Sequence, residues 1–234
     1  MKNEKKAAWA LGFRCLGFLT GVVGIVMQMT ADEVVGGGFM MNHDLAYFTV
    51  QTNIFSTLIF GVLAWKAWRG CRKTGRLEIA VIHPGVHLAC TCYITITMLG
   101  YWLLLFPMSG IPKNPYLCAS TLALHAVVPL LALLDHGIFA PHGQVRQREV
   151  FGWLGYPVVY LISIFCLAGL LRTPYYSIPV AGTMVPLWMP YPFLDAHVVG
   201  FWGVAGAIAA LAVFFLLLGS LFIALDRRRG RRKA

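Results

Sequence analysis

The sequence predicts an all-α polytopic membrane protein, a bundle of six transmembrane helices that forms a single domain over residues 1–234. Hydrophobic residues make up 59% of the chain and charged residues only 12%, with a mean hydropathy of +0.71. This composition is far more apolar than that of a soluble domain. Six apolar stretches are also long enough to cross a bilayer, because a helix rises about 1.5 Å per residue through a hydrocarbon core about 30 Å thick. We place them near residues 8–29, 45–68, 80–106, 116–139, 150–172 and 197–225.

The distribution of basic residues predicts the orientation of the bundle. Of the 19 Lys and Arg residues, all except Lys113 and Arg172 fall at the termini or in connections on one side of the predicted membrane. Positively charged residues stay on the cytoplasmic side. We therefore expect both termini to be cytoplasmic.

The first apolar stretch follows Lys2 and Lys6 and so has the outline of a signal peptide. Arg14 interrupts the stretch, and no small-residue cleavage site precedes Asp32. We expect the stretch to be retained as the first helix.

The net charge of +10 would suggest a nucleic-acid partner if the protein were soluble. Here the basic residues flank apolar runs, where they set topology and contact anionic headgroups. The expected partners are therefore membrane lipids, and no nucleic acid is expected. The sequence does not indicate an oligomeric state.

The connection over residues 173–196 is rich in proline and aromatic residues. Such a segment is unsuited to a lipid-exposed helix, but its Trp and Tyr side chains suit the headgroup region. We expect an outer cap loop here.

Polar residues within the predicted helices mark the candidate functional positions. A hydrogen-bonding side chain in hydrocarbon costs free energy unless it faces a partner or a cavity. Three helices carry such residues mostly at spacings of three or four, which place them on one helical face. The three stripes are Thr49, Thr52, Asn53 and Ser56; His83, His87, Thr91 and Thr95; and Cys118, Thr121 and His125, followed by Asp135 and His136.

Depth in the membrane decides which of these residues can meet. Thr49 and Asn53 lie about 6 to 12 Å below the outer start of the second helix, and His125 lies about 13 Å below the outer start of the fourth. We expect these residues, together with Thr52, at a common level. Asp135 lies about 15 Å beyond His125 along the helix, which makes it a poor partner for that imidazole.

Pro129 adds a polar feature beside His125. Proline has no backbone N–H, so the carbonyl of His125, four residues earlier, loses its helical partner and the helix is expected to kink.

A hydroxyl beside an imidazole in a dry pocket is the minimum for nucleophilic acyl transfer. The same residue types also form hydrogen bonds between membrane helices, so the spacing alone leaves both interpretations open. His83 and His87 are candidate metal or haem ligands, although a helix start near Pro84 explains His83 more simply.

Four short motifs resemble the bacterial branch of the androgen-induced, androgen-dependent transmembrane protein family. They are Tyr47-Phe-Thr-Val-Gln-Thr-Asn53, Leu124-His-Ala-Val-Val-Pro129, Tyr156-Pro157 with Tyr160, and Tyr191-Pro-Phe-Leu-Asp195. The resemblance covers the second to sixth helices and implies a bacterial cytoplasmic membrane as the location. Eukaryotic members of that family are similar to six-helix threonine hydrolases that cleave esters of fatty acids with hydroxy fatty acids.

The resemblance implies an intramembrane hydrolase of lipid esters in which Thr49 is the nucleophile and His125 the base. Depth along the helices places the same two residues together. Thr52, one turn from Thr49, remains an alternative nucleophile. No metal and no soluble cofactor is implied. The residues expected to contact the lipid ester are Thr52, Asn53, Thr121, Tyr191 and Asp195.

Two other functions use the same residues differently. A lipid-binding or transport protein would line a path with the polar stripes and would perform no catalysis. A haem-binding membrane electron carrier would need paired histidines on different helices.

Overall fold

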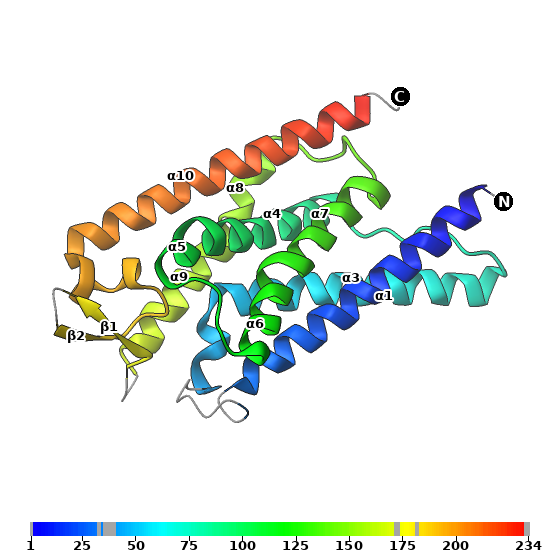
Figure 1. The fold of residues 1–234 in the computed structure, drawn as a ribbon. Helices are drawn as coiled ribbons and strands as arrows, with labels where there is room; N and C mark the ends of the chain where they lie inside the picture. Colours follow the sequence, from blue (N-terminus) through cyan, green and yellow to red (C-terminus); the bar gives the residue numbers. More distant parts are fainter. Residues whose placement is uncertain (1, 32–33, 35–40, 171–173, 181–182, 232–234) are drawn as a thin grey trace.

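The computed structural model is an all-α bundle of six membrane-spanning helices, which confirms the predicted fold class (Figure 1). The structure describes the chain except for residues 1, 32–33, 35–40, 171–173, 181–182 and 232–234. Asp32 and Arg172, which the sequence predictions used, lie outside the described residues. Within the described part, the spans are Asn3–Met29, Phe48–Thr74, Pro84–Leu105, Pro115–Phe139, Glu149–Ala168 and Ala196–Arg231. The chain is an integral membrane protein.

Several spans are divided into shorter helices. The α-helices are α1 (Lys2–Met29), α3 (Phe48–Thr74), α4 (Pro84–Gly100), α5 (Phe106–Ser109), α6 (Pro115–Leu122), α7 (Val128–Phe139), α8 (Glu149–Trp153), α9 (Gly155–Ala168) and α10 (Ala196–Arg231). The shorter elements are the 3₁₀ helices η1 (Met41–Ala46) and η4 (Pro192–Leu194), the π-helical turns η2 (Tyr101–Leu105) and η3 (Ala123–Val127), and the strands β1 (Tyr176–Val180) and β2 (Thr183–Leu187). α1, α3 and α10 each continue beyond the predicted apolar stretch into Lys- and Arg-rich sequence, because both residue types are good helix formers.

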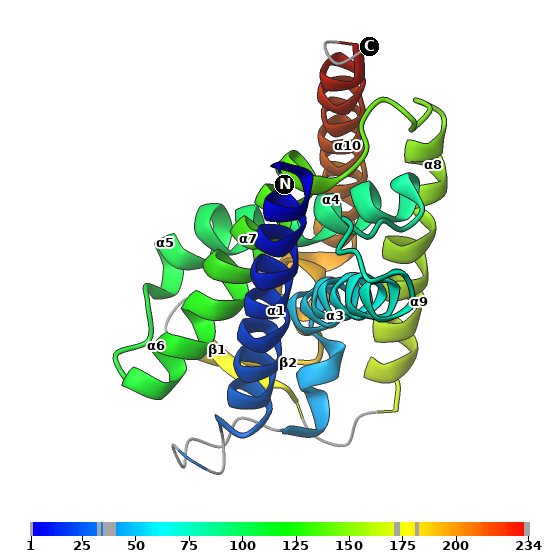
Figure 2. The ribbon, with the colours of Figure 1, turned by 90° about the vertical axis from the view of Figure 1, so that its right-hand side faces the viewer.

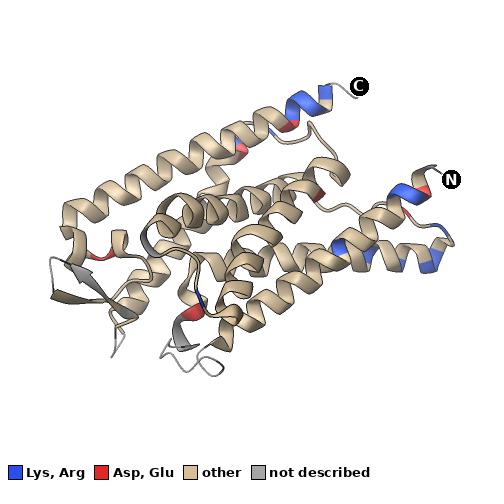
Figure 3. Cartoon of the chain, viewed as in Figure 1, with Lys and Arg blue, Asp and Glu red and all other residues tan. Residues whose placement is uncertain are grey.

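Both termini lie at the same end of the molecule (Figure 2). Lys and Arg residues gather at this end, at the start of α1 and at the ends of α3 and α10 (Figure 3). We call it the basic end. The strands β1 and β2 lie at the opposite end of the bundle (Figure 1).

Two membrane helices widen into a π-helical turn just before a proline. In η2, the N–H of Phe106 reaches back five residues to the carbonyl of Tyr101, and Pro107 follows. η3 has the same arrangement immediately before Pro129. Proline lacks an N–H, and its ring clashes with the carbonyl four residues earlier, so the helix relaxes into a wider turn. At Pro129, where the sequence predicts a kink, the structure has a π turn.

The outer connection, expected to be a cap loop, contains a two-stranded antiparallel hairpin. Tyr176 pairs with Leu187 at one end of the ladder, and Val180 pairs with Thr183 at the other. In a two-stranded hairpin both strands are edge strands, so part of each backbone pairs with no neighbouring strand. Proline lacks an N–H and is tolerated on edge strands, which accommodates the prolines at positions 179 and 186. Those prolines are the reason that the sequence pattern did not predict strands.

Glycines allow α1 to pack closely against its neighbours. A Cβ atom on Gly17 would lie 2.8 Å from the Phe60 ring, and one on Gly21 would collide with the hydroxyl of Thr57. Both neighbours belong to α3. Small residues are common at such membrane-helix contacts because they let the backbones approach.

We predict that Gly21→Ala destabilises the bundle by about 1–3 kcal/mol, because the added methyl overpacks the α1–α3 contact. Thermal unfolding in detergent measures this as a lower Tm. Gly12→Ala is the matched control, since a Cβ there has no atom within 4 Å. Equal Tm values for the two variants would contradict the close packing.

A buried ion pair joins α1 to α7. Arg14 Nε donates to Asp135 Oδ1 at 2.8 Å, and the two residues are 1% and 0% exposed. Arg14 Nη1 also donates to the Ala80 carbonyl at 2.9 Å, and His87 Nε2 lies 3.2 Å from Asp135 Oδ2. Asp135 is thus fully engaged by Arg14 and His87, away from His125, as its depth in the helix predicts.

We predict that Asp135→Ala destabilises the protein by about 3–5 kcal/mol, because it leaves the Arg14 guanidinium buried without its counter-charge. The double variant Arg14→Met/Asp135→Leu is expected to lose less, since it removes both charges. Chemical denaturation of the two variants in the same detergent gives the comparison. A double variant less stable than the single one would refute the prediction.

Candidate functional site

An apolar cavity of about 200 Å³ lies between α3, α4 with its π turn η2, α9, α10 and the segment that follows β2. Side chains such as Phe48, Leu161, Phe193 and Phe215 form its walls. Five polar residues interrupt this apolar lining: Thr49, Thr97, Tyr101, Tyr160 and Tyr191. Concave apolar sites with a few polar groups are typical of ligand-binding pockets.

The cavity reaches the lipid-facing surface of the bundle. Leu104 and Val158 line it, and each is 50% exposed on the outside of the protein. A molecule dissolved in the bilayer can therefore approach the cavity from the side.

The polar end of the cavity lies at the start of α3. Tyr47, the N-cap residue, has an extended backbone and contributes no side-chain cap. The first N–H groups of a helix have no acceptor within the helix. Here the backbone of Phe48 and Thr49 hydrogen-bonds to the phenol of Tyr191, which also contacts the hydroxyls of Thr49 and Tyr160. The Thr49 hydroxyl thus faces the cavity beside the positive end of the α3 dipole.

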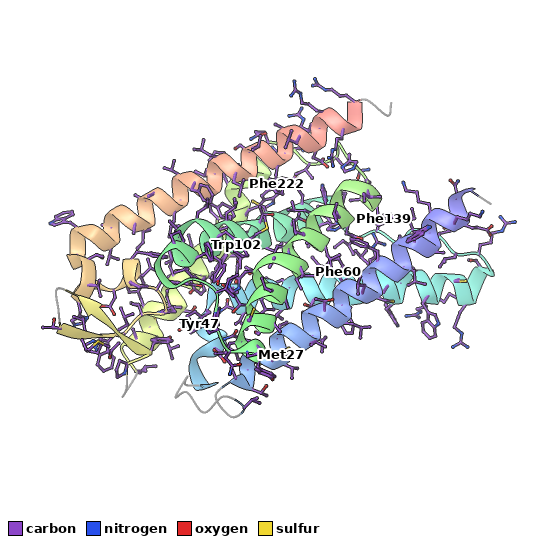
Figure 4. The ribbon with its side chains drawn as sticks, in the orientation of Figure 1. Met27, Tyr47, Phe60, Trp102, Phe139 and Phe222 are labelled. Atoms are coloured by element: carbon purple, nitrogen blue, oxygen red, sulfur yellow. The ribbon has the colours of Figure 1, made fainter. Side chains whose placement is uncertain are left out.

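Aromatic rings hold Tyr191 in this place. Tyr191 stacks on Phe193 with ring centroids 5.3 Å apart and meets Tyr47 edge-on at 5.8 Å. Tyr47 also meets the ring of Tyr175 edge-on at 6.1 Å, and Tyr175 directly precedes β1. Tyr47 therefore lies between the start of α3 and the hairpin (Figure 4). Burial raises the pKa of Tyr191, so its phenol stays protonated at neutral pH.

Asn53, one turn beyond Thr49, joins α3 to the fourth span. Its Nδ2 donates to the carbonyl of Thr49 at 2.9 Å and to that of Leu124 at 3.1 Å. The Leu124 carbonyl needs this donor, because the π turn diverts the Val128 N–H to Ala123. Asn53 is buried away from the cavity, and its Oδ1 has no partner among the described residues.

His125 lies behind the cavity wall. Its ring packs on Tyr101 with centroids 4.1 Å apart, and its Nδ1 lies 3.0 Å from the Thr121 carbonyl. Tyr101 lines the cavity and His125 does not. The structure therefore brings the elements carrying Thr49 and His125 together through Asn53, while Tyr101 lies between the imidazole and the cavity.

The carbonyl freed by Pro129 has a partner that sequence analysis did not find. Trp102 Nε1 donates to the His125 carbonyl at 2.9 Å, from the π turn η2 (Figure 4). The two π turns thus face each other. The signal in the sequence was the presence of Pro107 as well as Pro129 within the apolar stretches, with Trp102 five residues before Pro107.

The other predicted contact residues lie outside the cavity lining. Thr52 is buried and shares a 2.7 Å hydrogen bond with Thr97, which does line the cavity. Thr121 contributes its carbonyl to His125. Asp195 accepts the N–H of His197 at 2.9 Å and also that of Trp188, so it connects the start of α10 to the end of the hairpin.

The histidines considered for haem occupy other surroundings. His83 is exposed at the start of α4. His87 is engaged with Asp135, and the cavity that His87 lines holds only about 10 Å³, which leaves no room for a porphyrin.

No family model, no curated protein and no solved structure matches this chain. The family resemblance therefore rests on its four sequence motifs.

We predict that Trp102→Phe destabilises the protein by about 1–3 kcal/mol, because the His125 carbonyl loses a donor that no helical N–H can replace. Thermal unfolding in detergent tests this. Trp65→Phe is the matched control, since Trp65 is 50% exposed on the outer face of α3. Equal losses in both variants would show that the indole N–H is dispensable.

Proposed function

We propose that the protein is an intramembrane hydrolase of lipid esters that resembles the hydrolases of fatty acid esters of hydroxy fatty acids. We place it in a bacterial cytoplasmic membrane with both termini cytoplasmic. The observation that carries the proposal is the position of Thr49 at the polar end of a mainly apolar cavity. The lateral opening beside Leu104 and Val158 supports entry of the substrate from the bilayer.

In this proposal the acyl chain lies in the apolar cavity and the ester carbonyl lies at the start of α3. The Thr49 oxygen attacks the carbonyl carbon while His125 takes the hydroxyl proton. The bond to the leaving alkoxide then breaks, and His125 returns the proton to the alkoxide. Water then cleaves the acyl-threonine and regenerates the hydroxyl. The N–H groups of Phe48 and Thr49, which now contact Tyr191, would donate to the oxyanion.

His125 is the proposed base. Its ring is hydrogen-bonded to Thr121 and separated from the cavity by Tyr101 in the resting arrangement. The proposal therefore requires the Tyr101 ring to move when substrate binds. π-helical turns such as η2, which carries Tyr101, are frequent at functional sites.

We predict that a long-chain alkyl fluorophosphonate labels the wild-type protein and that Thr49→Ala abolishes labelling. His125→Ala is expected to slow lipid-ester hydrolysis by about 10²-fold or more, because general base catalysis contributes that much. Fragmentation mass spectrometry of the labelled peptide distinguishes Thr49 from Thr52.

Thr95→Ala is the control for this experiment. Thr95 is a buried α4 residue whose hydroxyl donates to the Thr91 carbonyl at 2.7 Å, and it does not line the cavity. Labelling that survives in Thr49→Ala, or its absence from the wild type together with inactivity on a panel of lipid esters, would refute the hydrolase.

A lipid-binding or transport protein without catalysis is the second candidate. The observation that favours it is that His125 packs behind Tyr101 and does not line the cavity that Thr49 lines. This candidate predicts that Thr49→Val retains a photoreactive fatty acid in the cavity and that the wild type forms no covalent adduct.

A further inference from the structure

A second cluster of functional side chains lies at the basic end, far from the cavity. It consists of His136 near the end of α7, His142 in the connection between α7 and α8, and Asp226 near the end of α10. His136 is eleven residues beyond His125, about 16 Å along the helix. The cluster is therefore independent of the proposed hydrolase site.

The three side chains converge on one carboxylate oxygen. Asp226 Oδ1 lies 2.8 Å from His142 Nδ1 and 3.2 Å from His136 Nε2. One ligand atom from each residue lies within 4.8 Å of the other two. All three side chains are at least nine-tenths buried. Two imidazole nitrogens and a carboxylate oxygen are a typical donor set for a divalent transition metal.

Backbone groups hold the side chains of His142 and Asp226 in the orientation that metal ligands usually have. His142 Nε2 lies 3.3 Å from the Gly137 carbonyl, which leaves Nδ1 free to point its lone pair at a cation. The Gly143 N–H donates to Asp226 Oδ2 at 2.8 Å, so the other carboxylate oxygen remains available. Metal-bound histidines usually donate their second N–H to such a carbonyl, and ligating carboxylates are hydrogen-bonded in turn.

Direct backbone packing holds the connection against α10. Gly143 has a φ of +83°, which favours glycine. A Cβ atom built on Gly230 would lie 2.7 Å from the Cα of Gly143, so a side chain at this crossing would force the two segments apart. Close packing of Gly143 against α10 fixes His142 opposite Asp226.

Hydrogen bonding alone leaves part of this arrangement unexplained. Both ring nitrogens of His142 face oxygen atoms, Nδ1 the Asp226 carboxylate and Nε2 the Gly137 carbonyl. His136 Nδ1 is buried without a partner among the described residues. A divalent cation held by the three side chains would balance the charge of the buried Asp226 carboxylate.

We propose that His136, His142 and Asp226 bind one divalent first-row transition metal, with water completing the coordination. The donor set suits Zn²⁺ and Fe²⁺, whereas Mg²⁺ and Ca²⁺ prefer oxygen ligands alone. The bound metal would connect α7, the α7–α8 connection and α10 at the basic end.

Metal binding is tested on the full chain in detergent, stripped with a chelator and with any histidine tag removed. Titration with Zn²⁺, or with Fe²⁺ under anaerobic conditions, is expected to load about one ion per chain by elemental analysis. Co²⁺ is expected to give the visible absorption of a low-symmetry site. Bound Zn²⁺ is expected to raise the Tm, because the metal binds only the folded state.

The variants His142→Ala and Asp226→Asn are expected to weaken Zn²⁺ binding by about 100-fold or more. His83→Ala is the matched control, an exposed histidine near the same end, and it is expected to bind Zn²⁺ like the wild type. Failure of the wild type to bind either metal at micromolar concentration would overturn the proposal and leave a hydrogen-bonded structural cluster. Unchanged binding in both cluster variants would also overturn it. The wild-type titration decides the question even if a variant does not fold.

Discussion

The need to satisfy every backbone carbonyl inside the membrane governs the centre of this bundle. Hydrocarbon offers no donor to a carbonyl that a proline has deprived of its helical partner. Pro107 and Pro129 create this situation on adjacent spans, and each helix responds with a π turn. Asn53 and Trp102 then donate to the carbonyls of the fourth span. These two side-chain donors hold the second, third and fourth spans in register, and the position of the cavity wall follows from that register.

The ion pair between Arg14 and Asp135 complements this arrangement nearer the basic end. It fixes the first span, which contributes no residue to the cavity lining, against the fourth span, which carries His125. Because Arg14 also binds the Ala80 carbonyl, the segment leading into α4 is held at the same point. The bundle is therefore joined at two levels, by neutral hydrogen bonds at the π turns and by charges near the basic end.

The sequence predicted those features that depend on length, hydropathy or local backbone chemistry. The six spans follow from apolar length, and the disturbance at Pro129 follows from its missing N–H. The depth argument correctly separated Asp135 from His125. Of the two residues that the sequence places at one level, Thr49 lines the cavity and His125 does not.

Features that depend on side-chain direction between distant segments could not be predicted. Helical depth placed Thr49 and His125 at one level, but it could not reveal that Tyr101 packs between the imidazole and the cavity. The cluster of His142 with Asp226 joins residues 84 positions apart and requires the packing of Gly143 on α10. The hairpin was missed because its prolines are unfavourable in most strands.

The contact between Tyr191 and the start of α3 links the cavity to the hairpin. Any carbonyl that takes the N–H groups of Phe48 and Thr49 must first displace the phenol that occupies them. Tyr191 stacks on Phe193 and touches Tyr47, which in turn touches Tyr175 at the base of the hairpin. The Tyr191 hydroxyl therefore lies only two ring contacts, Tyr191 to Tyr47 and Tyr47 to Tyr175, from the base of the hairpin.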